Sequence, residues 1–301
     1  MLDLSVIILT YNEEIHLQRC IENIKPIAKD IFVVDSFSND KTIEIAEKLG
    51  TEVFQNKWPG NQAEQFNWVL QNIPIQTKWV LRLDADEYLT EELVTELKQR
   101  LAELPEHISG VLFKRRHIFL GKWVKRGTYP VKLLRLFQTG KGVCEQRLMD
   151  EHIQLTEGDA VEFASDFVDH NLNNLDWWTS KHIGYAIREA IDLLDIELGI
   201  LGNAQAGEKK NLGKQAENKR STKHKYAKQP LFFRSFAYFI YRYIFKLGFT
   251  EGKEGFLWHF LQGWWYRTLV DAKIFEIKKA CGSDKKKILK YIKDNYNISV
   301  K

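Results

Sequence analysis

The sequence predicts an α/β fold, in which crossover helices connect the strands of a parallel sheet and amphipathic helices follow toward the C-terminal end. Three observations lead to this prediction. An uninterrupted apolar run at residues 4–9 is typical of a strand that is covered on both faces. Strand-like and helix-like segments then alternate up to about residue 104, and many of the aromatic residues lie after residue 230.

The strands of the parallel sheet are expected at residues 4–9, 31–35, 52–54 and 79–84. Helices are expected between and after them, at residues 12–24, 42–49, 63–72 and 91–104. The pattern then changes, with short β-like segments at 111–113 and 131–137 and a helix at 177–198.

The amino-acid composition indicates how the chain is divided into domains. The segment 202–229 has almost no large apolar residues, which predicts a main domain at residues 1–200, a basic polar linker at 201–230 and an aromatic helical region at 231–301. The net charge of +4, from 44 basic and 40 acidic residues, is too balanced to indicate nucleic-acid binding. The three cysteines, Cys20, Cys144 and Cys281, are few and far apart, as expected in a reducing compartment.

No secretory signal is apparent at the N-terminal end, and no stretch of about 20 uncharged apolar residues is present. We therefore expect a cytoplasmic protein.

Polar clusters follow three of the predicted strands, at residues 10–13, 35–40 and 84–87. Ligands of parallel α/β sheets collect at the carboxyl ends of the strands, so these clusters are expected to converge. Two aspartates one residue apart, Asp84 and Asp86, could present carboxylate oxygens to a hard divalent cation and to a ribose. Asp35 is placed to accept hydrogen bonds from a ribose or a base.

These clusters carry a resemblance to a known family. The segments 5–14 (SVIILTYNEE), 33–42 (VVDSFSNDKT) and 83–87 (LDADE), in this order and spacing, resemble a family 2 glycosyltransferase with the GT-A fold, a mixed, mainly parallel sheet with flanking helices. The segments 119–123 (FLGKW) and 134–137 (LRLF) are similar to the branch that includes lipopolysaccharide-core β-glucosyltransferases.

The resemblance implies an inverting transferase that uses a UDP-sugar donor and Mg²⁺ or Mn²⁺, with Asp84 on the nucleotide and Asp86 on the metal. Trp58-Pro59-Gly60, followed by Gln65 and Asn67, resembles a segment that lies before the aspartate motif in this family. The expected donor-binding residues are Thr10, Tyr11, Asn12, Glu13, Asp35, Asn67, Asp84 and Asp86.

Inversion by a single displacement needs one general base that takes the proton of the acceptor hydroxyl. The candidates are Glu151 and Asp150. The lipopolysaccharide-core branch carries a glutamate at the position of Glu151, whereas other family members use an aspartate, so Asp150 stays the alternative.

His170 matches a histidine that this branch carries after the base, where it would complete the metal shell or bind the diphosphate. Lys181 and Tyr185 lie one helical turn apart and, with Arg135, are candidates for contacts with phosphate or acceptor.

The aromatic helices after residue 230 allow two interpretations. In the first, they form a hairpin that packs on the catalytic domain or on a sister subunit of a homo-oligomer. In the second, they form an amphipathic anchor at the inner face of the cytoplasmic membrane. In the second interpretation Arg234, Arg242 and Lys246 form a polar basic face.

Two other classes of function fit the sequence less well. An NAD-dependent dehydrogenase or another nucleotide-binding α/β enzyme would need a glycine-rich turn after the first strand, where this chain has Thr10-Tyr11-Asn12-Glu13. A partner subunit that only binds a nucleotide sugar would not need a base. The sugar, the acceptor and the linkage are not readable from the sequence.

Overall fold

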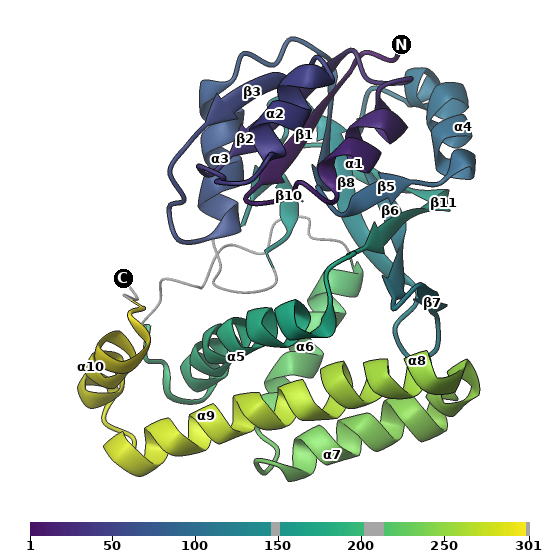
Figure 1. The fold of residues 1–301 in the computed structure, drawn as a ribbon. Coiled ribbons are helices and arrows are strands. Elements are labelled where there is room, and N and C mark those ends of the chain that lie inside the picture. Colours follow the sequence, from purple (N-terminus) through teal and green to yellow (C-terminus); the bar gives the residue numbers. More distant parts are fainter. Residues whose placement is uncertain (146–150, 202–213, 299–301) are drawn as a thin grey trace. The chain divides into compact units, whose positions relative to one another are not determined.

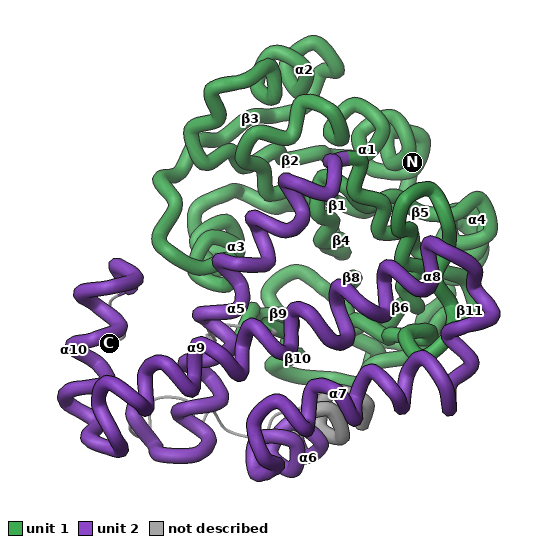
Figure 2. The backbone as a smooth tube through the Cα atoms, turned by 60° about the horizontal axis from the view of Figure 1, so that its bottom comes forward, with its two compact units in different colours: residues 1–146, 151–172, 209–213 green, residues 147–150, 173–208, 214–301 purple. Residues whose placement is uncertain are grey.

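The protein is described from a computed structural model, which covers residues 1–145, 151–201 and 214–298. These residues form two compact units (Figure 2). The first unit contains residues 1–145 and 151–172, and the second contains residues 173–201 and 214–298. Each unit is described by itself.

The first unit is built on a mixed sheet with the strand order β3-β2-β1-β4-β8-β6-β11-β5, and β7 pairs with β6 at one end (Figure 1). A short hairpin of β9 and β10 forms a separate antiparallel pair. The strands are β1 (Leu4–Thr10), β2 (Asp30–Asp35), β3 (Glu52–Gln55), β4 (Trp79–Asp84), β5 (Glu87–Leu89), β6 (Ile108–Phe119), β7 (Lys122–Val124), β8 (Val131–Gln138), β9 (Gly142–Cys144), β10 (Ile153–Leu155) and β11 (Asp159–His170).

The first half of this sheet confirms the predicted parallel arrangement. Strand β1 lies between β2 and β4 and is parallel to both, while β3 extends the sheet beyond β2. The helices that connect these strands are α1 (Leu17–Ile24), α2 (Thr42–Lys48) and α3 (Gln62–Asn72), and α4 (Glu91–Arg100) follows β5.

The second half of the sheet is larger than the sequence indicated. The expected short β segments at 111–113 and 131–137 belong to the longer strands β6 and β8, which pair antiparallel to each other. Strand β11, which the sequence analysis did not predict, runs parallel to β6 and antiparallel to β5. Its polar residues interrupt the alternation by which a half-buried strand is recognised.

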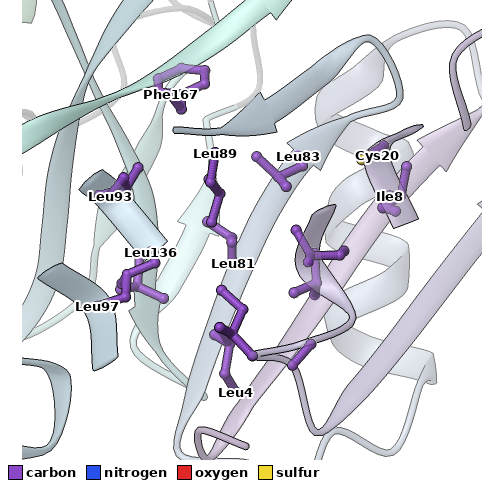
Figure 3. Packing of buried hydrophobic residues seen from close by; sticks show 14 of the residues in the cluster. Leu4, Ile8, Cys20, Leu81, Leu83, Leu89, Leu93, Leu97, Leu136 and Phe167 are labelled. Carbon is purple, nitrogen blue, oxygen red and sulfur yellow. The ribbon is translucent and has the colours of Figure 1, made fainter. Parts of the chain in front are cut away.

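Helices cover both faces of the parallel strands, which explains why β1 is mostly apolar on both faces. Leu4, Val6 and Ile8 pack toward α1 and α4, whereas Ile7 packs on the opposite face toward Phe66 of α3. Figure 3 shows the first of these cores, with the labelled side chains Leu4, Ile8, Cys20, Leu81, Leu83, Leu89, Leu93, Leu97, Leu136 and Phe167. The predicted α/β class, with a mixed sheet and flanking helices, is confirmed.

The second unit is helical and has a core of its own. Its helices are α5 (Leu175–Leu198), α6 (Lys214–Ala227), α7 (Phe233–Ile240), the π-helical segment η3 (Tyr241–Phe245), α8 (Gly252–Trp258), the π-helical segment η5 (His259–Trp265), α9 (Tyr266–Cys281) and α10 (Lys285–Tyr296). Apolar residues of α5, α9 and α10 form the core, among them Ala190, Leu194, Val270, Ile274 and Ile288. Within residues 1–145, 151–201 and 214–298, none of the helices has both the length and the apolar composition needed to span a bilayer.

Some boundaries differ from those expected. The division between the units falls after Leu172 rather than at residue 200, because α5 packs its buried face against α9. Residues 214–227 of the expected linker form α6. Helix α1 begins at Leu17 rather than near Asn12, because side-chain hydrogen bonds hold residues 12–14 in a loop.

Candidate functional site

The carboxyl ends of β1, β2 and β4 bring the three polar clusters together, as the strand order predicts. Thr10 pairs in register with Asp35, and Leu9 pairs with Asp84. The Thr10 hydroxyl donates to Asp35 Oδ1 at 3.0 Å. The candidate donor residues of all three clusters therefore share one edge of the sheet.

Asp35 is fully buried and organises the loop that follows β2. Its Oδ2 accepts the Ser38 N–H at 2.8 Å, and its Oδ1 accepts the Ser38 hydroxyl at 2.5 Å. The carboxylate thus closes a tight turn at the strand end, through the backbone N–H three residues further along the chain. A contact between Asp35 and a ribose or a base stays a prediction.

Asn12 ties the loop after β1 to the loop after β2. Its backbone has the left-handed φ of 56°, its N–H donates to the Ser38 hydroxyl at 2.8 Å, and its Oδ1 accepts the Asn39 N–H at 2.9 Å. Asparagine tolerates this backbone region better than most residues. Tyr11 stays 57% exposed at the same edge, and is available to a ligand there.

Glu13 connects the first loop to the end of β11 through a buried histidine. The Leu172 N–H donates to His16 Nε2 at 2.9 Å, so the proton of the neutral ring lies on Nδ1, which contacts Glu13 Oε2 at 2.6 Å. The Glu13 N–H donates to the Thr42 hydroxyl at 2.8 Å. Glu13 is therefore held rigidly beside the candidate donor site.

Asp84 lies among three cationic or amide side chains from different elements. Gln62, at the start of α3, donates to Asp84 Oδ1 at 3.1 Å. Arg82 Nη2 lies 3.8 Å from the same oxygen, and Arg135 Nη2 on β8 lies 3.5 Å from Oδ2. A carboxylate held by several donors from several elements is well oriented for a ligand.

Beneath Asp84, Glu87 and Arg135 form a buried ion pair at 2.5 Å, and Glu87 Oε2 also accepts the Asp84 N–H at 2.9 Å. The pKa of Glu87 is raised to about 8, mainly by burial and also by the Asp84 and Asp169 carboxylates, whereas Arg135 lowers it. The structure thus places Arg135 in the ion-pair network below Asp84. Its predicted contact with phosphate or acceptor remains a prediction.

Asp86 is half-buried next to other carboxylates. Burial, together with Asp169 and Asp84, raises the pKa of Asp86 to about 6, although Asn171 donates to its Oδ2 at 2.9 Å. The His170 N–H donates to the Asp86 carbonyl oxygen at 3.0 Å, so the two residues predicted to serve the metal are adjacent. The His170 ring contacts Arg19 Nη1 through Nδ1 at 3.2 Å.

The chemistry of this edge fits a hard divalent cation that is shared with a diphosphate. Among the described residues, no group of three or more His, Cys, Asp or Glu side chains is arranged to hold a metal by itself. Mg²⁺ is commonly bound by one or two carboxylates together with substrate phosphates, rather than by a cage of protein ligands. A cation beside Asp86 would also offset the repulsion among the Asp84, Asp86 and Asp169 carboxylates.

The β9–β10 hairpin carries the candidate base. Asp150 lies outside the described residues, and Glu151 is half-buried just before β10. The Glu145 N–H, just after β9, donates to the carbonyl oxygen of His152, just before β10, at 2.9 Å.

Cys144 and Arg82 link this hairpin to Asp84. Arg82 Nη1 donates to Cys144 Sγ at 3.5 Å, while its Nη2 faces Asp84. Burial raises the pKa of the Cys144 thiol, Arg82 lowers it, and the Glu151 carboxylate raises it. Arg82 therefore contacts both Asp84, the candidate ligand of the nucleotide, and Cys144 in the hairpin that carries Glu151, the candidate general base.

Asn67 on α3 holds the hairpin through both ends of its side-chain amide. Asn67 Nδ2 donates to the Cys144 carbonyl oxygen at 2.7 Å, and Asn67 Oδ1 accepts the Cys144 N–H at 2.8 Å. This geometry gives Asn67 a positioning role. The donor contact expected from the sequence stays a prediction.

We expect Asn67→Ala to slow transfer more than it weakens UDP binding, because the substitution removes both hydrogen bonds that hold Cys144 near Glu151. Two half-buried backbone groups lose their partners, at a cost of about 1–3 kcal/mol each. UDP titration, transfer rates and thermal unfolding would measure the three effects. Asn72→Ala is the matched control, because Asn72 is exposed on the same helix and donates only to Trp68. A selective loss of UDP affinity in Asn67→Ala would instead support the donor contact.

Lys181 and Tyr185 lie on α5 in the second unit. Lys181 Nζ lies 4.3 Å from the centre of the Trp177 ring and 5.8 Å from that of Tyr185, so the predicted spacing of one helical turn is present. Their contact with phosphate or acceptor stays a prediction.

Several residues of the site were not identified from the sequence: His16, Arg19, Gln62, Arg82 and Asn171. Arg82 gave a usable signal, since a lone arginine interrupts an otherwise apolar buried strand. The others lie in segments with no distinguishing pattern, and only the tertiary contacts reveal them.

Comparison with known proteins supplies the family context. Residues 5–155 match the family model described as glycosyl transferase family 2. A protein of Rickettsia bellii described as an uncharacterized glycosyltransferase is 38% identical over 95 residues, which cover 32% of this chain and 31% of that protein. The chain thus spans about a third of the length of the Rickettsia relatives that it matches.

Two further proteins are similar to the chain. The lipopolysaccharide core biosynthesis glycosyltransferase LpsC of Rhizobium meliloti is 29% identical over 146 residues, 47% of this chain and 53% of that protein. The structure of glucosyl-3-phosphoglycerate synthase from Mycobacterium tuberculosis superposes with a TM-score of 0.32 and 23% identity, over 38% of this chain and 44% of that one.

Proposed function

The chain belongs to glycosyl transferase family 2, and from this premise we propose that it is an inverting glycosyltransferase that moves a hexose from a UDP-sugar to a glycan or lipid-linked acceptor. The observation that carries the proposal is the convergence of Thr10, Asp35, Asp84 and Asp86 at one edge of the parallel sheet. Ligands of open α/β sheets bind at this edge.

The proposed chemistry divides the work among residues of the first unit. Asp84, oriented by Gln62 and Arg82, binds the nucleotide. Glu151 removes the proton from the acceptor hydroxyl as this oxygen attacks the anomeric carbon and the bond to the diphosphate breaks. Asp86 and His170 would hold Mg²⁺ or Mn²⁺, which supplies positive charge to the departing diphosphate.

We further propose a place in bacterial cell-surface polysaccharide or lipopolysaccharide synthesis, at the inner face of the cytoplasmic membrane. The similarity to LpsC, whose name assigns it to lipopolysaccharide core biosynthesis, supports this proposal. The segments 119–123 and 134–137 support it as well, because they resemble the same branch of the family.

A donor panel tests the proposed function. UDP-, GDP- and dTDP-sugars are incubated with the protein and Mn²⁺ or Mg²⁺, and release of the nucleoside diphosphate is measured. We expect hydrolysis of a UDP-sugar that requires the metal and stops when EDTA removes it. Binding of UDP without hydrolysis or transfer of any donor would favour the alternative of a non-catalytic partner subunit.

A further inference from the structure

Helix α7 and segment η3 reverse the distribution of side chains that is usual for a helix at a protein surface. The membrane-anchor interpretation of the sequence placed Arg234, Arg242 and Lys246 on one polar basic face. In the structure Lys246 is exposed, but Arg234 and Arg242 are buried, at 4% and 1% exposure. Large apolar side chains are exposed instead. We name as the aromatic ridge the exposed residues Phe233, Phe236, Tyr241, Ile244, Phe245, Leu247 and Phe249.

The inward polar residues have partners within the second unit. Arg234 donates to Asp271 Oδ1 through Nε at 2.8 Å and to the Ala227 carbonyl oxygen through Nη1 at 2.9 Å. Arg242 Nη1 donates to Gln262 Oε1. Because buried ionic groups require such partners, these contacts fix which side of α7 faces inward.

Aromatic packing reinforces the same orientation. Phe239 stacks on Trp264 of η5 at a ring distance of 5.3 Å, and Phe236 contacts the edge of the same indole at 5.3 Å. Both views show α7 lying alongside the helix formed by α8, η5 and α9 (Figures 1 and 2). The ridge is therefore held on the outside of a paired-helix structure.

The ridge is continuous rather than a set of scattered apolar residues. Phe233 and Phe236 lie about one turn apart on α7, and Tyr241, Ile244 and Phe245 lie within about one turn on η3. Leu247 and Phe249 extend the exposed surface toward α8. Phe233 is 63% exposed and Phe245 is 73% exposed. Contiguous apolar surface of this kind marks an interaction site, whereas singly exposed apolar residues do not.

The charge around the ridge favours an anionic partner. Residues 218–250 contain no aspartate or glutamate, and the exposed lysines Lys225, Lys228 and Lys246 lie before and within the ridge. The two acidic residues that follow the ridge in the chain are Glu251, which is buried, and Glu254, which is half-buried. A second copy of this chain docked ridge to ridge would bring lysines against lysines, which disfavours self-association.

We propose that the aromatic ridge inserts into the interface of an anionic phospholipid bilayer, with the lysines at the headgroups. Apolar insertion and attraction to anionic lipid are the two contributions that bind interfacial helices, and tyrosine suits the headgroup layer. The proposal deepens the proposed place at the inner face of the membrane by naming the surface that binds there. It does not rest on the transferase activity, because bilayer binding requires neither a donor nor an acceptor.

Vesicle co-sedimentation of the full chain tests the proposal. We expect binding to vesicles of phosphatidylglycerol and phosphatidylcholine, and much weaker binding to phosphatidylcholine alone. The double variant Phe233→Ser and Phe245→Ser should bind at least about tenfold more weakly, because two exposed aromatic side chains no longer insert.

A matched pair of single variants separates the ridge from general exposed apolar surface. Ile244→Ser removes an isoleucine of the ridge that is 45% exposed, and Ile183→Ser removes one on α5 that is 49% exposed. Only Ile244→Ser should weaken vesicle binding. Equal effects of the two substitutions, or unchanged binding of the double variant, would overturn the proposal.

Three further measurements keep the test decisive. Brominated acyl chains should quench tryptophan fluorescence of the unaltered protein, since Trp264 packs directly against Phe236. Sedimentation equilibrium without lipid should show no association that depends on the ridge, and such association would reassign it to a contact between copies. Release of nucleoside diphosphate without vesicles should be the same in wild type and ridge variants, so failure of the donor panel remains a separate outcome.

Discussion

Replacing Glu151 with glutamine should lower the rate of sugar transfer by about a hundredfold to ten-thousandfold, the range typical of a lost general base. Glutamine keeps the size of the side chain and its place before β10, but it cannot accept the proton of the acceptor hydroxyl. UDP affinity should be nearly unchanged, because Asp84 and its partners Gln62 and Arg82 are unaltered. Transfer rates at saturating donor and a UDP titration would measure the two effects.

The control for this substitution is Glu157→Gln. Glu157 is exposed in the turn after β10 and pairs only at the surface with Lys141, at 3.0 Å. Its replacement should leave transfer unaffected, because exposed ion pairs contribute little. If Glu151→Gln retains most of its activity while Asp150→Asn loses it, the base is Asp150.

Asp86→Asn should remove the stimulation of UDP binding by Mn²⁺. Substitution of a group that only supports a metal ligand typically lowers metal affinity by roughly 10–100-fold. Because Asp86 is itself the proposed ligand, we expect a loss of metal-dependent UDP affinity that is at least as large. Folding should not suffer, because the substitution takes one negative charge away from Asp84 and Asp169. Calorimetric UDP titrations with Mn²⁺ and with EDTA, together with thermal unfolding, separate binding from stability.

Asp159→Asn serves as the control for Asp86→Asn. Asp159 is exposed at the opposite end of β11 from His170, so its loss should change neither UDP affinity nor its dependence on the metal. UDP binding that is independent of metal and insensitive to Asp86→Asn would exclude the proposed cation site.

The parallel half of the fold was readable from the sequence because its signals are local. A strand buried on both faces has a largely apolar run, and β1 and β4 show such runs, interrupted by Ser5 in β1 and by Arg82 in β4. Ligand-binding clusters follow directly at the strand ends, so Thr10, Asp35 and Asp84 could be grouped before any contact was known.

The antiparallel half was less predictable because its pairing is not local. Arg135 reaches Asp84 and Glu87 only because β8 pairs with β4, more than 40 residues earlier in the chain. Asn67 illustrates the same limit. Its residue type suggested a contact with a ligand, whereas in the structure its side-chain amide makes hydrogen bonds with the backbone of Cys144 in β9.

The amphipathic helices show most clearly what the sequence left open. A helical wheel separates Arg234 and Arg242 from the phenylalanines, but it does not say which side faces inward. The ion pair of Arg234 with Asp271 and the contact of Arg242 with Gln262 turn the arginines inward and leave Phe233 and Phe245 exposed.

The sequence by itself determined the α/β class, the positions of the parallel strands along the chain and the three clusters at their ends, because each is encoded within a few consecutive residues. Only the tertiary structure decided which cations surround Asp84, what Asn67 holds and which face of α7 is exposed. The physical reason is that these depend on pairing between distant segments, where a buried charge or amide must find its partner.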